Sequence, residues 1–114
     1  MQLNLFPQSD GVTIQVDERR IDAAIALAFK DRIRSLVAHG GDRVVLDLSA
    51  VEFMDSSGLG AIIAIYKSMP AGRSFSLIGL TPNVERVFRL TRMDSVIAIR
   101  PASDTGQTAE RRVE

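Results

Sequence analysis

Short β-branched segments alternate along this chain with longer segments whose apolar residues recur at helical spacing. Residues 11–16 alternate apolar and polar side chains, and residues 43–48 form a short apolar run between turn signals. Such runs are typical of strands, half-buried in the first case and buried in the second. Further strands are indicated at residues 74–78 and 96–99, and residues 19–21 are expected to extend the first strand. The alternation predicts one α/β domain, with a mixed, mostly parallel sheet of about four to five strands packed with helices.

Three helices are indicated between these strands. The first begins at Asp22, whose side chain is expected to cap it, and ends at His39-Gly40-Gly41, where glycine suits a left-handed cap. The second follows residues 55–60 and stops at Pro70. The third begins at Thr81-Pro82, since proline is favoured in the first turn of a helix.

Composition and charge exclude several classes of function. The 14 basic and 14 acidic side chains cancel, whereas proteins that bind nucleic acids usually carry a basic excess. No apolar run approaches the ~20 residues that span a bilayer, and the first residues do not resemble a signal peptide. We therefore expect a cytoplasmic protein that contacts neither membrane nor nucleic acid directly. We also expect a monomer or weak dimer.

The two ends of the chain differ in character. Residues 1–100 contain all the predicted strands and helices, so we expect them to form the domain. Residues 101–114 are polar and carry no apolar stripe, which predicts a disordered or frayed tail.

The segment Asp55-Ser56-Ser57-Gly58-Leu59-Gly60 lies where a buried strand hands over to an amphipathic helix. A helix begins with four N–H groups that lack partners within the helix, and serine side chains can accept hydrogen bonds from them. The same N–H groups and the positive end of the helix dipole also favour an added phosphate. The charge of Asp55 opposes a phosphate by repulsion. Local chemistry therefore favours a capping role for the serines and leaves phosphorylation as the second interpretation.

The sequence gives no support for an enzyme. A nucleophilic serine needs a base to activate it, and the single histidine, His39, is predicted at the end of another helix. The chain has no cysteine, and one histidine cannot form a histidine metal cluster. Gly58-x-Gly60 lacks the third glycine and the lysine of nucleotide-binding loops. We expect no catalytic residue, no cofactor and no metal.

The run Phe53-Met54-Asp55-Ser56-Ser57-Gly58-Leu59-Gly60, which follows Val45-Leu46-Asp47-Leu48, resembles the signature of STAS domains. These are modules of sulphate transporters and of anti-sigma factor antagonists. Ile21-Asp22 is similar to a Leu-Asp pair of the family, and Leu77 to Pro82 is similar to its later strand and helix start. The resemblance extends over roughly residues 10–100 and implies a STAS fold of the antagonist class.

The resemblance implies that the serine directly after the aspartate is phosphorylated in this class. In this chain that serine is Ser56. An anti-sigma factor that is itself an ATP-binding serine kinase transfers the phosphate. The unphosphorylated antagonist binds this kinase and frees a sigma factor, and a metal-dependent serine phosphatase resets the cycle. The expected partner-binding residues are Asp22, Asp55, Ser57, Gly58 and Leu59.

Two further points follow from the comparison with the family. Asp17-Glu18-Arg19-Arg20 occupies a stretch where the family usually has a glycine, so the loop beside Asp22 is expected to differ in shape and charge. STAS modules also occur as non-phosphorylated subunits or scaffolds of transport and stress-sensing complexes. Such a constitutive role is the alternative to the phosphorylation switch.

Overall fold

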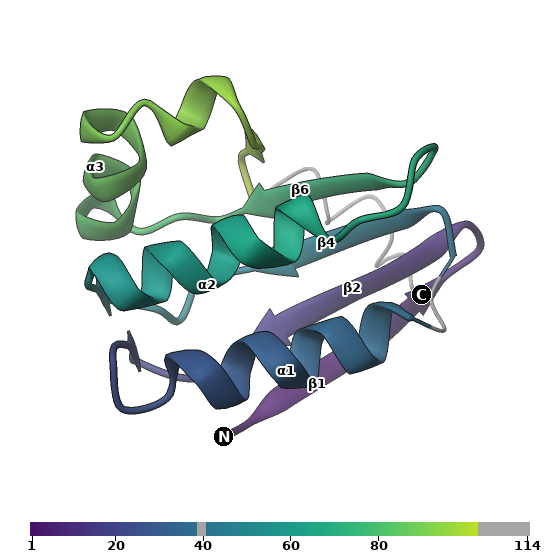
Figure 1. Ribbon diagram of the computed structural model, residues 1–114, viewed down its shortest axis with the longest axis horizontal. Helices are drawn as coiled ribbons and strands as arrows, with labels where there is room; N and C mark the ends of the chain where they lie inside the picture. Colours follow the sequence, from purple (N-terminus) through teal and green to yellow (C-terminus); the bar gives the residue numbers. More distant parts are fainter. Residues whose placement is uncertain (39–40, 103–114) are drawn as a thin grey trace.

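The computed structural model describes residues 1–38 and 41–102 and contains two sheets (Figure 1). The main sheet has five strands in the order β1-β2-β4-β6-β7, and β3 pairs with β5 in a small second sheet. The strands are β1 (Leu3–Gln8), β2 (Gly11–Val16), β3 (Arg20–Ile21), β4 (Arg43–Asp47), β5 (Phe53–Met54), β6 (Ser74–Ile78) and β7 (Ala98–Arg100). The helices are α1 (Ala26–Val37), α2 (Ser56–Lys67), α3 (Pro82–Leu90) and the short 3-10 helix η1 (Met93–Ser95).

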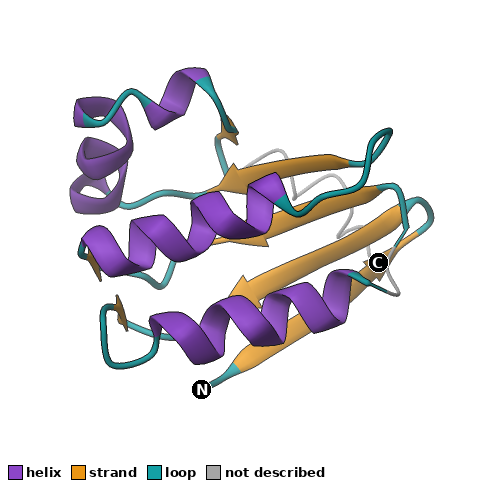
Figure 2. Ribbon diagram, in the orientation of Figure 1, coloured by secondary structure: helices purple, strands orange, loops and turns teal. Residues whose placement is uncertain are grey.

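The predicted fold class is confirmed. β2, β4, β6 and β7 run parallel, and β1 is antiparallel to β2. Parallel neighbours need a crossover, and here α1, α2 and α3 supply them. Figure 2 shows α1 and α2 side by side on one face of the main sheet. The carboxyl ends of β2 and β4 therefore lie at the same end of the sheet. From this end the chain continues toward the helices.

Strand β1 was not expected from the sequence. It forms a hairpin with β2, in which Gln8 pairs with Gly11 across Ser9 and Asp10. Pro7 lies within β1, and proline usually argues against a strand because it cannot donate a ladder hydrogen bond. An edge strand tolerates proline, and β1 is the edge of the main sheet.

The small β3–β5 sheet joins two loops that are far apart in the sequence. Arg20 pairs with Phe53 and Ile21 pairs with Met54, in parallel. The expectation that residues 19–21 extend the first strand is therefore wrong, since β3 leaves the main sheet and pairs elsewhere. Ile21 and Met54 are buried, so their packing holds the two loops together against the core.

The start of α1 also differs from the prediction. The helix begins at Ala26, its N-cap residue is Ile25, and no side chain caps it. Asp22 instead closes a turn before the helix, because its carbonyl oxygen accepts hydrogen bonds from the N–H groups of Ile25 and Ala26 at 3.1 and 2.9 Å. His39 and Gly40, where the helix was predicted to end, lie outside the described residues.

The core lies between the main sheet and the helices. Its fully buried large side chains include Ile14, Leu46 and Leu77 from central strands, Phe29 and Ile33 from α1, Ile62 and Ile65 from α2, and Phe88 from α3. Pro82 opens α3 at its first turn, as predicted. The last strand is found at Ala98–Arg100 rather than 96–99, because the N–H groups of Val96 and Ile97 donate to the carbonyl oxygen of Met93 in η1.

Within the described residues, no helix has both the length and the apolar character that crossing a membrane requires. Residues 103–114 lie outside the described part of the chain. The predicted boundary near residue 100 and the polar tail stay predictions.

Candidate functional site

The carboxylate of Asp55 fixes the start of α2. Asp55 is the N-cap residue with extended backbone, and its Oδ1 accepts a hydrogen bond from the Gly58 N–H at 3.0 Å. This bond satisfies one of the N–H groups that the first helical turn leaves unpaired. It is also the main reason that the pKa of Asp55 is lowered from its ordinary value of 3.8. The Asp55 carboxylate therefore acts as an acceptor for backbone N–H groups.

The second oxygen of Asp55 reaches the loop before α1. Oδ2 accepts a hydrogen bond from the Ala23 N–H at 3.1 Å, across 32 positions in the sequence. The Asp55 N–H in turn donates to the carbonyl oxygen of Ile21 at 3.4 Å. One side chain thus binds the amino end of α2 and the loop that precedes α1, and sets their relative position.

Ser56 and Ser57 are exposed at the start of α2. Neither hydroxyl forms a hydrogen bond with another of the residues that the structure describes. The interpretation of the serines as helix caps is therefore wrong, because Asp55 performs that function. The Ser56 hydroxyl is consequently accessible at the surface, directly beside a carboxylate.

Gly58 and Leu59 are buried, unlike the serines. A Cβ at Gly58 would lie 2.2 Å from the carbonyl oxygen of Ile21 and 2.9 Å from Met54 Cγ, so only glycine fits there. Leu59 packs in the core. The expectation that Gly58 and Leu59 take part in binding a partner stays a prediction.

Asp22 lies at the same corner but with different partners. Its Oδ1 accepts from the Ala24 N–H at 3.1 Å, and its Oδ2 pairs with Arg20 Nε at 3.2 Å. Because Ala23 is bound to Asp55, the turn at Asp22 lies against the start of α2. Asp22 and Asp55 thus lie at one corner of the domain, and their role in binding a partner stays a prediction.

Phe53 was not assigned a role from the sequence. Its exposed ring lies under the guanidinium of Arg20, with 4.3 Å between the Arg20 Cζ and the ring centroid. The two residues are paired in the β3–β5 register. That pairing of two-residue strands leaves no periodic signal, so the sequence could not have revealed it.

The carboxylate at this corner is poorly suited to activate the neighbouring hydroxyl. Both Asp55 oxygens accept backbone hydrogen bonds and its pKa is lowered, so it is a poor base for activating Ser56. In the described part of the chain, no three acidic or histidine side chains gather in a way that could hold a metal ion. The site offers an exposed hydroxyl on a fixed helix end.

Comparisons with known proteins give the family. The family model of the STAS domain matches residues 6–106. The anti-sigma-B factor antagonist of Listeria monocytogenes is 32% identical over 81 residues, which cover 70% of this chain and 71% of the relative. That of Bacillus subtilis is 29% identical over 108 residues, covering 93% and 98%. The chain belongs to the STAS domain family.

A solved structure supports the same assignment. The crystal structure of an anti-sigma factor antagonist from Mycobacterium paratuberculosis superimposes with a TM-score of 0.83 at 29% identity. The match covers 96% of this chain and 93% of that one. The relatives named here are thus similar over most of the domain.

Proposed function

We propose that this chain is an anti-sigma factor antagonist controlled by phosphorylation of Ser56. Its unphosphorylated form binds an anti-sigma factor that is also an ATP-dependent serine kinase, and this frees a sigma factor. The kinase phosphorylates Ser56 and so ends the binding, and a metal-dependent serine phosphatase restores it. The printed names of the Listeria, Bacillus and Mycobacterium relatives support this class of function.

The observation that carries the proposal is the free hydroxyl of Ser56. The side chain is exposed at the first position of α2 and caps nothing, since Asp55 holds the helix end. A kinase needs such access to bring the hydroxyl in line with the γ-phosphate of ATP. The hydrogen bonds that the Asp55 carboxylate accepts do not involve the Ser56 hydroxyl, so we expect the domain to stay folded when Ser56 is phosphorylated.

The switch follows from the charge of the phosphate. A phosphoserine carries about two negative charges at neutral pH, and here they would stand beside the Asp55 carboxylate. A partner that packs against the bare hydroxyl would have to bury these charges without counter-ions. A penalty of ~3 kcal/mol weakens binding more than a hundredfold. The protein would act through binding in the cytoplasm, without catalysis of its own.

Substitutions at Ser56 test the proposal. Calorimetric titration with the purified anti-sigma factor kinase of the source organism is expected to show unchanged affinity for Ser56→Ala. Ser56→Asp is expected to bind about a hundredfold more weakly. Ser35→Asp, which adds the same charge on the exposed face of α1, is the control and should bind like the wild type.

Mass spectrometry after incubation with ATP and the kinase completes the test. Phosphate is expected on the wild type and on Ser57→Ala, and absent from Ser56→Ala. Equal binding by Ser56→Ala and Ser56→Asp, together with no phosphate on Ser56, would contradict the proposal. That result would favour a constitutive subunit or scaffold of a transport or stress-sensing complex.

A further inference from the structure

Gly58 and Gly60 lie two positions apart in α2 but face different surroundings. Backbone from β3 forbids a side chain at Gly58, as described above. At Gly60 an added Cβ would meet no atom within 4 Å apart from its chain neighbours and the adjacent backbone of α2, and the residue is exposed. Glycine in the interior of a helix is less stable than alanine, so Gly60 costs stability that no packing within the described residues repays.

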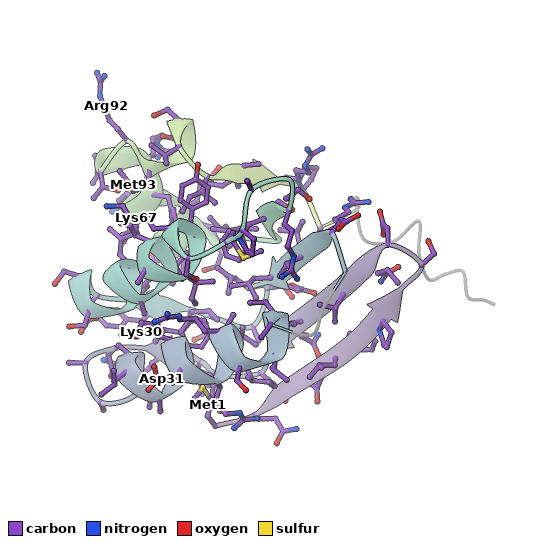
Figure 3. The ribbon with its side chains drawn as sticks, turned by 45° about the vertical axis from the view of Figure 1, so that its right-hand side comes forward. Met1, Lys30, Asp31, Lys67, Arg92 and Met93 are labelled. Atoms are coloured by element: carbon purple, nitrogen blue, oxygen red, sulfur yellow. The ribbon has the colours of Figure 1, made fainter. Side chains whose placement is uncertain are left out.

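Gly60 lines a shallow apolar groove between α1 and α2. The α2 side of this groove consists of Gly60, Ala61 and Ala64, with Ser57 at its end, and the α1 side includes Leu27 and Lys30. Figure 3 shows Lys30 between the ribbons of these two helices. The groove begins one residue from Ser56, so a partner that covers Ser56 has direct access to it.

Leu27 and Lys30 are both available to a partner. Leu27 is 67% exposed although it is a large apolar residue. Lys30 forms no ion pair within the described part of the chain, and it is the charged residue that lines this groove. An apolar side chain of a partner could cover Leu27, while a carboxylate next to it would complement Lys30.

We infer that the α1–α2 groove receives a segment of the anti-sigma factor, with a large apolar side chain seated against Gly60 and Leu27 and a carboxylate beside Lys30. The inference rests on the proposed function and names where that partner docks. The missing Cβ at Gly60 lets the partner approach the helix backbone closely. A phosphate on Ser56 then stands at the end of the same contact and blocks it.

The first test uses Gly60→Ala, for which stability and binding should move in opposite directions. The midpoint of thermal unfolding is expected to rise by about 4 °C, because alanine favours the helix and meets no neighbour. The affinity for the purified kinase that phosphorylates the wild-type chain is expected to fall about tenfold. The larger Gly60→Leu is expected to bind still more weakly while remaining folded.

The second test uses the α1 side of the groove with matched controls. Leu27→Ala is expected to weaken binding about tenfold, whereas Leu90→Ala, on α3 and 75% exposed, should bind like the wild type. Lys30→Met keeps the aliphatic stem but removes the charge, and it should weaken binding and reduce its dependence on salt. Lys30→Arg keeps the charge and should restore both.

Wild-type affinity for Gly60→Leu and Leu27→Ala would overturn the inference. If Ser56→Asp abolishes binding while these two variants bind normally, the docking site lies elsewhere and the proposed function stands. If the wild type itself neither binds the kinase nor accepts phosphate on Ser56, the proposed function fails and the inference fails with it.

Discussion

The two long helices begin in different ways, although each follows an aspartate. At α1, the Asp22 carboxylate binds the Ala24 N–H within its own turn, and no side chain caps the helix. At α2, the Asp55 carboxylate caps the helix and also binds the Ala23 N–H in the other loop. The start of α1 thus depends on a local turn, whereas the start of α2 is held by a contact across 32 positions. The hydroxyl that we propose as the switch belongs to the second, more firmly held helix end.

The largest expected effect is that of Gly58→Ala. The new Cβ would lie 2.2 Å from the carbonyl oxygen of Ile21, so β3 and α2 must separate. We expect a loss of about 3 kcal/mol in the free energy of unfolding, measured by urea denaturation at neutral pH. Gly60→Ala is the matched control, with no clash. Equal urea midpoints for the two variants would show that the close approach of Gly58 to the Ile21 carbonyl oxygen does not determine which side chain fits at position 58.

Asp55→Ala is expected to have the next largest effect. It removes the cap of α2 and the bond to Ala23 together. The midpoint of thermal unfolding should fall by about 4–8 °C, as for loss of a helix cap in a domain of this size. Asp55→Asn retains one acceptor oxygen, so its midpoint should lie between those of alanine and the wild type. If Asp55→Asn and Asp55→Ala have equal midpoints, the amide oxygen of asparagine does not cap α2.

Acid should remove the same contribution from the wild type. The pKa of Asp55 is lowered in the folded state, chiefly by the Gly58 N–H, so the folded state favours the ionised form. Its contribution is therefore complete above the ordinary pKa of 3.8 and is lost as the pH falls from there through the lowered value. The difference in urea midpoint between the wild type and Asp55→Asn should be constant from pH 7 to about pH 4 and shrink below. A difference that does not change with pH would mean that the charge of Asp55 contributes nothing.

Asp22→Ala is expected to have the smallest effect. It removes the bond to the Ala24 N–H and an exposed ion pair with Arg20, while the carbonyl oxygen of Asp22 still binds Ile25 and Ala26. The loss in unfolding free energy should be below about 1 kcal/mol by urea denaturation. If Asp22→Ala destabilises the domain as much as Asp55→Ala does, the distinction between the two helix starts is incorrect.

The fold class was predictable because the central strands are long enough to show their pattern. Residues 43–47 and 74–78 carry buried apolar runs, and the helices between them carry apolar stripes. β1 was missed because Pro7 argues against a strand unless the strand is known to be an edge. β5 was missed, and β3 was assigned to the first strand, because each has two residues and only their pairing in space defines them.

A candidate site could be chosen from the sequence, but its geometry could not be derived from it. The spacing of Asp55, Ser56 and Ser57 at a strand-to-helix handover was sufficient to select the corner. The sequence could not decide which of the three side chains caps α2, since all three types can do so. The partners of Asp55 at Ala23 and of Gly58 at Ile21 come from a distant loop, and the placement of that loop depends on the β3–β5 pairing.

Asp55 caps α2, whereas the Ser56 side chain does not, and this difference affects how such a protein can evolve. The side chain at position 56 does not cap the helix, so it can be exchanged during evolution without loss of the fold. A lineage could install threonine there, or an acid that mimics a permanently modified state, in a single mutational step. Asp55 cannot be exchanged as freely, because its carboxylate joins the start of α2 to the loop before α1.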